Sequence, residues 1–170
     1  MKRLHLHVSV PDLAQSIRFY ETLFGAPPTV VKNDYAKWML EDPKVNLAIS
    51  THRASGLDHV GIQVETPAEL ADLSDRLKAA GARTFDEADT TCCYAKSDKS
   101  WVSDPAGLRW ETFFTHGEAT TYGESQALAA LEASAPTSSA CCGPAPSARV
   151  EAAATSSCCA PASAKTSSGG

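Results

Sequence analysis

The sequence predicts an α+β fold made of two βαβββ units, and three observations support this prediction. Residues 4–10 alternate apolar and polar side chains, which is the period of a half-buried strand. The segment after Pro11 carries apolar residues at helical spacing and stops at Gly25, a residue typical of a helix end. The same order of patterns begins again at Leu57, so the chain contains an internal repeat of supersecondary size.

The remaining elements follow from local patterns and turn signals. In the first unit, Asn33-Asp34 and Glu41-Asp42-Pro43 separate three short strands, expected over residues 29–32, 35–40 and 45–50. In the second unit, Thr66-Pro67 opens a helix that ends at Gly81. The strands of this unit are expected over residues 57–64, 83–86 and 109–115 and near residues 101–103.

Composition divides the 170 residues into one domain and a tail. We expect the domain to span residues 1–118, with modules of about 1–53 and 54–118. Residues 119–170 are rich in Ala, Ser, Pro and Cys and hold too little apolar area to offset the entropy of ordering, so we expect a flexible, disordered tail. Helix propensity indicates a short helix at residues 126–133 within it.

Charge and hydropathy narrow the classes of partner. The net charge is −5 and no long basic run occurs, which argues against nucleic acid and anionic membranes as partners. No apolar stretch of about 18 residues is present, which argues against a transmembrane helix. The sequence begins without the apolar region of a secretory signal, so we expect a cytoplasmic protein with reduced thiols. Monomer and homodimer both remain open.

All six cysteines occur in adjacent pairs. Neighbouring cysteines do not readily form a disulfide with each other, but two adjacent thiolates chelate soft ions such as Cd(II) or trivalent arsenic. Cys92-Cys93 lies within the expected domain. The tail pairs are either mobile traps for soft metal or metalloid, or incidental to a low-complexity extension; they are Cys141, Cys142, Cys158 and Cys159.

Three stretches of the domain resemble the glyoxalase/bleomycin-resistance/extradiol-dioxygenase superfamily, whose fold is called vicinal oxygen chelate: residues 12–25 (DLAQSIRFYETLFG), 58–64 (DHVGIQV) and 104–111 (DPAGLRWE). The resemblance covers residues 1 to about 116 and implies that the two modules form an open barrel around a metal site. It also implies that the metal ligands project from the first and last strands of the modules.

On that resemblance, His5 and His59 occupy matching places in the two modules, and Glu111 lies on the last strand of the second. Two histidines and a carboxylate with open positions are typical of non-haem Fe(II) sites that activate O₂, although Zn, Mn or Ni can occupy such a set. His7 shares a face with His5 at period two and remains an alternative ligand. The fourth superfamily position, near residues 47–49, is apolar here.

The loop around Cys92-Cys93, together with residues 99–101 and 110–111, resembles a narrower group: cadmium-induced proteins and the organoarsenical carbon–arsenic lyases of bacterial arsenic resistance. This resemblance implies that Cys92 and Cys93 bind a trivalent organoarsenical, and that His59 and Glu111 act as iron ligands and catalytic residues. The expected reaction uses Fe(II) and O₂ and leaves arsenite.

Two other functions remain open. One is a non-catalytic resistance protein that binds cadmium or arsenite through its thiols. The other is a generic glyoxalase or dioxygenase-type enzyme. Either function fits part of the sequence, but thiol binding alone gives no role to His59 and Glu111, and a generic enzyme gives none to Cys92 and Cys93. Lys96 and Lys99 lie close to the thiols in sequence, where a positive charge would lower a thiol pKa.

Overall fold

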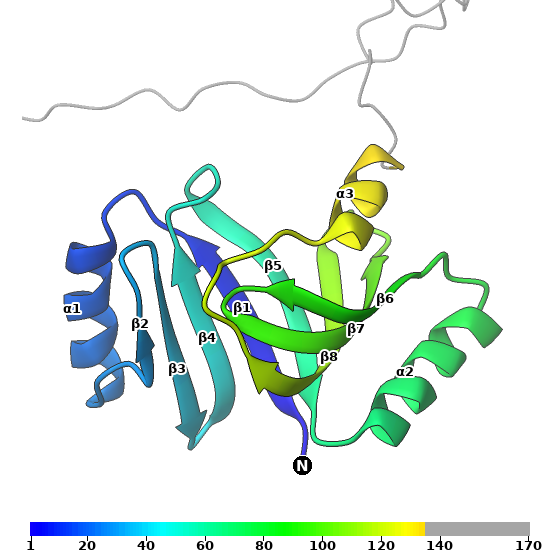
Figure 1. Cartoon of the computed structure of the whole chain (residues 1–170), viewed down its shortest axis with the longest axis horizontal. Coiled ribbons are helices and arrows are strands. Elements are labelled where there is room, and N and C mark those ends of the chain that lie inside the picture. Colours follow the sequence, from blue (N-terminus) through cyan, green and yellow to red (C-terminus); the bar gives the residue numbers. More distant parts are fainter. Residues whose placement is uncertain (135–170) are drawn as a thin grey trace, which may run out of the picture. The chain divides into compact units, whose positions relative to one another are not determined.

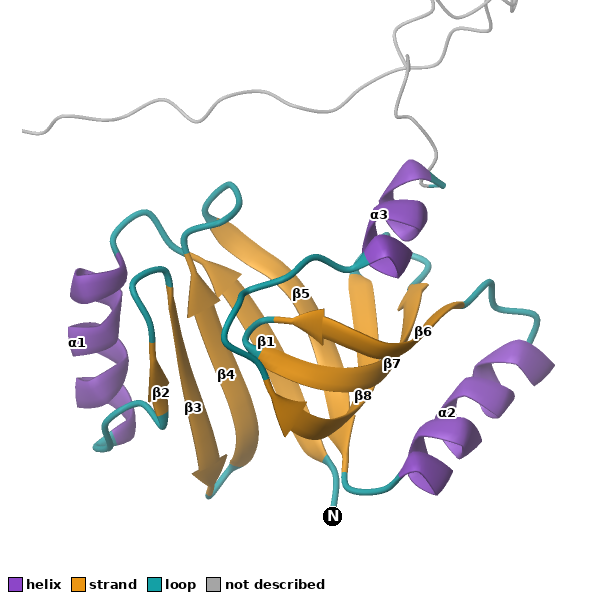
Figure 2. Ribbon diagram, viewed as in Figure 1, coloured by secondary structure: helices purple, strands orange, loops and turns teal. Residues whose placement is uncertain are grey.

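The structure is a computed structural model that describes residues 1–134. Its elements follow one another as two βαβββ units and a final helix (Figures 1 and 2): β1 (Arg3–Ser9), α1 (Leu13–Phe24), β2 (Val30–Val31), β3 (Tyr35–Glu41), β4 (Lys44–Ser50), β5 (Gly56–Val64), α2 (Pro67–Ala79), β6 (Phe85–Cys92), β7 (Ala95–Ser103), β8 (Arg109–Glu118) and α3 (Gln126–Ala133). The predicted α+β class and the doubled unit are confirmed.

The eight strands form one curled sheet in the order β2-β3-β4-β1-β5-β8-β7-β6 (Figure 1). Within each unit the first strand pairs in parallel with the last, as β1 with β4 and β5 with β8. The two units join where β1 pairs antiparallel with β5, so both modules of the barrel come from one chain. The first strands of the two modules therefore lie side by side at the centre of the sheet.

The apolar core of the first module lies between its strands and α1. Trp38, Ile49 and Leu47 are buried, and side chains from α1 such as Ile17 and Tyr20 pack on them. The side chain of Asp12 caps the start of α1 by accepting a hydrogen bond from the backbone of Gln15. Because side chains alternate along a strand, this packing sends the other face of β1 toward the concave side of the sheet.

The β6–β7 hairpin is longer than predicted, since β6 runs to Cys92 and β7 begins at Ala95. Only residues 83–86 and 101–103 were expected as strands here. The prediction missed the rest because the intervening residues are polar. Ser97 and Lys99 are nevertheless buried, because they line the small cavity on the concave face of the sheet rather than facing solvent. A polar strand that lines a site carries no hydrophobic alternation.

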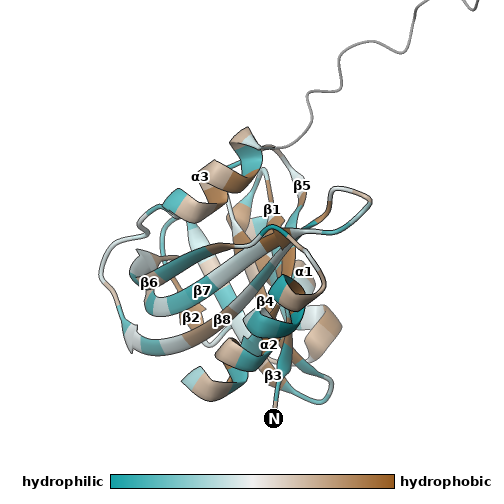
Figure 3. Ribbon diagram, turned by 90° about the vertical axis from the view of Figure 1, so that its right-hand side faces the viewer, coloured by the Kyte–Doolittle hydropathy of each residue, from teal (hydrophilic) through white to brown (hydrophobic). Residues whose placement is uncertain are grey.

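Helix α3 extends the packed part of the chain beyond the expected domain end at residue 118. The helix forms at the predicted residues, and Leu128 and Leu131 are buried against Trp101. Figure 3 shows both apolar and polar residues on it. The segment was assigned to the tail because its alanine-rich composition gives little sign of a partner surface. Cys141, Cys142, Cys158 and Cys159 lie outside the described residues.

The helices found among residues 1–134 are all too short or too polar to cross a membrane.

Candidate active site

Three central strands bring histidines and a carboxylate together on the concave face of the sheet. His5 and His7 come from β1, His59 from β5 and Glu111 from β8, and all four are buried. In the pairing of β1 with β5, His7 lies opposite His59 and His5 lies opposite Gly61. Glu111 then pairs with Gly61 on the far side of β5. The structure therefore gathers the three predicted metal ligands.

The donor atoms of these residues are spaced as ligands of one divalent cation would be. Nε2 of His5 lies 3.3 Å from Nε2 of His59, and each of these nitrogens lies 3.6 Å from Oε2 of Glu111. Ligand bonds of about 2.0–2.2 Å place neighbouring donor atoms about 3.0–3.6 Å apart, so the set fits a metal ion.

Hydrogen bonds at the opposite ring nitrogens orient both histidines. Nδ1 of His5 donates to the backbone oxygen of Asn46 at 3.0 Å, and Nδ1 of His59 donates to Asp58 at 3.0 Å. In the neutral ring each Nε2 then carries the lone pair that a bound cation would take. Burial alone would lower the pKa of His59, but its hydrogen bonds with Asp58 and Glu111 raise it, so a cation would bind at Nε2 in competition with a proton. Burial, followed by the neighbouring His59, lowers the pKa of His5 to about 4 despite the nearby Glu111, which keeps His5 a neutral donor.

Lys99 forms a buried ion pair with Glu111, with 2.6 Å between Nζ and Oε1. Burial by itself would raise the pKa of Glu111, but the Lys99 ammonium and His59 outweigh it and hold this pKa well below its usual range. The pairing uses Oε1 and leaves Oε2 toward the two histidines. The carboxylate is thus ionised and correctly turned to act as a ligand.

His7 has a different environment from His5. Its Nε2 lies 2.9 Å from Oγ of Ser50, and its buried Nδ1 has no hydrogen-bond partner among the described residues. His5, His7 and His59 also form a group whose donor atoms lie within 4.8 Å of one another. The contacts of His5 with the Glu111 carboxylate favour His5 as the first-module ligand, with His7 beside the set.

Gly61 and Asp58 support the site and were not predicted as functional. A Cβ atom at Gly61 would approach the backbone oxygen of Glu111 to 2.2 Å, so only glycine lets β8 lie this close. Asp58 connects His59 to Arg109, whose guanidinium donates to the Asp58 carboxylate at 2.7 Å. A glycine inside a strand is a known sign of close backbone approach, and it was available in the sequence.

The thiol pair lies at the tip of the β6–β7 hairpin. Cys92 ends β6, and the two turn residues Cys93 and Tyr94 both have positive φ, at 57° and 62°. This conformation suits a tight hairpin turn but is costly for residues other than glycine, asparagine or aspartate. The Tyr94 hydroxyl donates to Asp34 at 2.6 Å, and Ala119 donates to the Tyr94 backbone oxygen at 3.0 Å. Contacts from the first module and from the residue that follows β8 therefore hold the turn.

The two thiols differ in acidity. Their sulfur atoms lie 3.1 Å apart, and the hydrogen bond from Cys93, followed by the Lys99 charge, lowers the pKa of Cys92 to about 7. The same hydrogen bond and burial raise the pKa of Cys93 well above its usual value. Cys92 thus ionises near neutral pH, whereas Cys93 stays a thiol. The expected influence of lysine charge belongs to buried Lys99, while Lys96 is exposed.

The alkylation rate of Cys92 is expected to rise with pH with a midpoint near 7, because iodoacetamide reacts with the thiolate. Lys99→Met should move the midpoint upward, since it removes a positive charge from the surroundings of Cys92. The exposed Lys96→Met serves as the matched control and should leave it unchanged. Peptide-resolved mass spectrometry separates Cys92 from the other thiols. Equal shifts in both variants would exclude the specific role of Lys99.

Two cavities meet at the thiol pair. A small one of about 30 Å³ is lined by Cys92 and Cys93 together with His5, Lys99 and Glu111. A larger one of about 380 Å³ is lined by both thiols, His59, Trp101 and residues 122–129.

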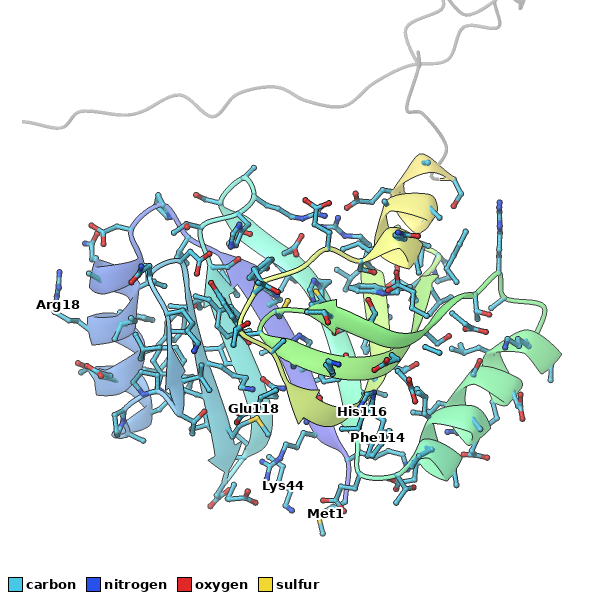
Figure 4. The ribbon with its side chains drawn as sticks, in the orientation of Figure 1. Met1, Arg18, Lys44, Phe114, His116 and Glu118 are labelled. Carbon is cyan, nitrogen blue, oxygen red and sulfur yellow. The ribbon has the colours of Figure 1, made fainter. Side chains whose placement is uncertain are left out.

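The two remaining histidines, His52 and His116, are exposed. His116 lies near the end of β8 (Figure 4), and His52 lies at the rim of the larger cavity. Neither belongs to the cluster of His5, His59 and Glu111.

A curled sheet of paired βαβββ units with a His/His/Glu cluster on its concave face defines a class of protein. The profile of the Glyoxalase/Bleomycin resistance protein/Dioxygenase superfamily matches residues 2–112, and the chain belongs to this superfamily. An extradiol ring-cleaving dioxygenase from B. fuscum has a TM-score of 0.54 at 22% identity, over 69% of this chain and 33% of the dioxygenase. The Mn(II)-bound glyoxalase from Novosphingobium aromaticivorans has a TM-score of 0.52 at 14% identity, over 74% of this chain and 44% of that one. These two likenesses show the fold alone.

Relatives found by sequence similarity are more similar to this chain than these two structures are. A trivalent organoarsenical cleaving enzyme from Thermomonospora curvata is 38% identical over 156 residues, which cover 90% of this chain and 96% of that enzyme. A second protein of that name, from Bacillus sp. strain MD1, is 44% identical and covers 68% of this chain and 74% of its own length. The cadmium-induced protein CadI of Mycobacterium tuberculosis is 37% identical over 72% of this chain and 82% of that protein.

Proposed function

We propose that this protein cleaves the carbon–arsenic bond of trivalent organoarsenicals in a reaction that requires Fe(II) and O₂ and leaves arsenite. One observation carries the proposal: Cys92 and Cys93 border the same small cavity as His5 and Glu111. A thiol pair that binds arsenic there would hold the arsenic–carbon bond next to the candidate metal ligands. The names of the relatives at 38% and 44% identity support the same substrate class.

The residues divide into two sets with separate tasks. His5, His59 and Glu111 would hold the metal, and His59 and Glu111 are the catalytic residues that we assign. Iron(II) bound there would supply open coordination positions and the electrons that activate O₂. Lys99 keeps Glu111 ionised, and Asp58 fixes the tautomer of His59.

Cys92 and Cys93 would capture the arsenical R–As(OH)₂ by exchanging two hydroxyl groups for two sulfur bonds. The Cys92 thiolate attacks first, and the proton of Cys93 leaves with the displaced hydroxyl as water. Cys93, now a thiolate, displaces the second hydroxyl, which solvent protonates. The third bond of arsenic keeps the organic group, so the reacting carbon is fixed in place. Such fixation converts a bimolecular step into an effectively unimolecular one.

An arsenite-release assay tests this function. Purified protein loaded with Fe(II) under argon receives methylarsonous acid, and arsenite is measured before and after air is admitted. We expect arsenite only in air. Arsenical binding with no arsenite release would favour the alternative of a sequestering resistance protein. Neither binding nor release would instead favour a generic superfamily enzyme.

A further inference from the structure

The larger cavity has one wall that comes from outside the two repeated modules. Cys92, Cys93 and His59 lie on one side, and residues 122–129 lie on the other, including Tyr122, Leu128 and Ala129. These residues follow the last strand of the second module and contain the first turn of α3 (Figure 1). The repeated fold therefore supplies the metal ligands and the thiols, and an added segment completes the cavity.

This wall is firmly attached to the second module. Glu87 of β6 accepts hydrogen bonds from the Ser125 hydroxyl at 2.6 Å and from the Ala127 backbone at 2.7 Å. At the other end of α3, Glu132 pairs with Arg53 at 2.5 Å and also with Arg109. Bonds at both ends, together with the packing of Leu128 on Trp101, fix the position of the helix.

Tyr122 and Gly123 continue the attachment at the start of the wall. The Tyr122 ring stacks on His52, with 3.8 Å between ring centroids. Gly123 has φ of 67°, and a Cβ atom there would approach the backbone oxygen of Thr91 to 2.0 Å. The wall therefore lies directly against the end of the strand that carries Cys92.

The volumes of the two cavities separate small from large organic groups. The small cavity of about 30 Å³ has room for a water-sized group or a methyl, but not for a ring. The larger cavity of about 380 Å³ has room for an aromatic ring, since benzene fits an apolar cavity of about 150 Å³. Its lining combines the apolar side chains of Trp101 and Leu128 with polar groups from His52 and Arg53.

We propose that residues 122–129 form a selectivity wall that admits the aryl group of an arylarsenical, and that Ala129 sets the size that is accepted. This inference rests on the proposed function for its substrate class. An aryl group on arsenic bound to Cys92 and Cys93 would lie in the larger cavity, whose lining includes Tyr122 and Ala129. Ala129 is exposed and lines the cavity. Because its side chain is small, it leaves space that a larger side chain would fill.

The substitution Ala129→Phe tests the wall, and Ala130→Phe is its matched control. Ala130 is the adjacent exposed alanine of the same helix and is absent from the lining of the cavity. Both variants therefore carry the same change in helix propensity and side-chain size. The background is the full chain with Cys141, Cys142, Cys158 and Cys159 changed to serine, so that only Cys92-Cys93 binds arsenic. Binding of phenylarsonous and methylarsonous acid to metal-free protein is followed by tryptophan fluorescence.

We expect Ala129→Phe to weaken binding of the phenyl compound by about tenfold or more while the methyl compound changes little, because the added ring takes up space in the larger cavity that only the phenyl group needs. Ala130→Phe should change neither. Three results would overturn the proposed selectivity wall: equal losses of affinity for both compounds, equal losses of affinity in both variants, or no loss of affinity in Ala129→Phe. Arsenite release from methylarsonous acid is measured in parallel. The absence of arsenite would count against the proposed cleavage. The binding comparison would still show whether residues 122–129 select by the size of the organic group.

Discussion

Substitution of Glu111 by glutamine is expected to remove metal binding and to destabilise the protein at the same time. Glutamine keeps the shape of the side chain but leaves the buried Lys99 ammonium without its counter-ion. Removing one partner of a buried pair costs about 3–5 kcal/mol of unfolding free energy. Loss of a direct ligand should also weaken metal binding by more than the roughly 10–100-fold that the loss of a supporting residue causes.

The double variant Glu111→Gln/Lys99→Met separates these two effects. Removing both charges should restore most of the unfolding free energy, measured by urea denaturation, because no buried charge remains unpaired. Metal binding should stay lost. Manganese(II) is a suitable probe, read by electron paramagnetic resonance, because it prefers oxygen and nitrogen ligands to thiolates. Full manganese affinity in the double variant would mean that Glu111 has a structural role and is no ligand.

Substitution of Cys92 by serine is expected to weaken binding of phenylarsonous acid by about 100-fold or more. Two thiols on one hairpin act together, and a second tethered bond raises overall affinity by about 10²–10⁴-fold. Cys93→Ser should cause a similar loss, since either change leaves a single sulfur bond. Binding is measured on the chain with the four tail cysteines changed to serine. Unchanged binding in either variant would remove the thiol pair from the candidate site.

The same background tests the tail thiols. If the chain with serine at Cys141, Cys142, Cys158 and Cys159 releases arsenite as fast as the natural chain at low arsenical concentration, these pairs do not deliver substrate to the domain. A slower rate only at low concentration is the result expected of traps that pass the arsenical to Cys92 and Cys93.

The strands that carry the candidate metal ligands could be predicted because their environments leave a local pattern. Alternation along residues 4–10 placed His5 and His7 on one face of a strand, and the same order of patterns from Leu57 gave a second such strand with His59. That these two strands pair with each other was not predicted. The resemblance to a known family then supplied the roles of Glu111 and the thiols. Helices α1 and α2 could also be predicted from the sequence, since their caps Asp12 and Thr66 are local signals.

The features that escaped prediction depend on contacts between distant parts of the chain. The ion pair of Lys99 with Glu111 joins two strands whose register no local pattern specifies. The wall formed by residues 122–129 is built from a short alanine-rich helix, and what orders it is its fit against Trp101 and Glu87. Composition alone assigns such a segment to a tail, because the stabilising surface lies elsewhere in the sequence.

The register of the central strands shows how two similar halves arrive at one asymmetric site. In the internal repeat His5 corresponds to His59, and His7 corresponds to Gly61. The pairing of β1 with β5 is symmetric in these positions, since His5 lies opposite Gly61 and His7 lies opposite His59. Gly61 pairs with Glu111 on β8, whereas His7 pairs with Ala48 on β4. In the first half the large side chain is on the first strand and the small one on the last strand. In the second half this order is reversed, because glycine is on the first strand and glutamate on the last. Ala48 of β4 therefore holds the position that corresponds to Glu111 of β8, and it lines the small cavity together with both thiols. At this position one half of the repeat thus contributes a carboxylate to this cavity, and the other half contributes only a methyl group.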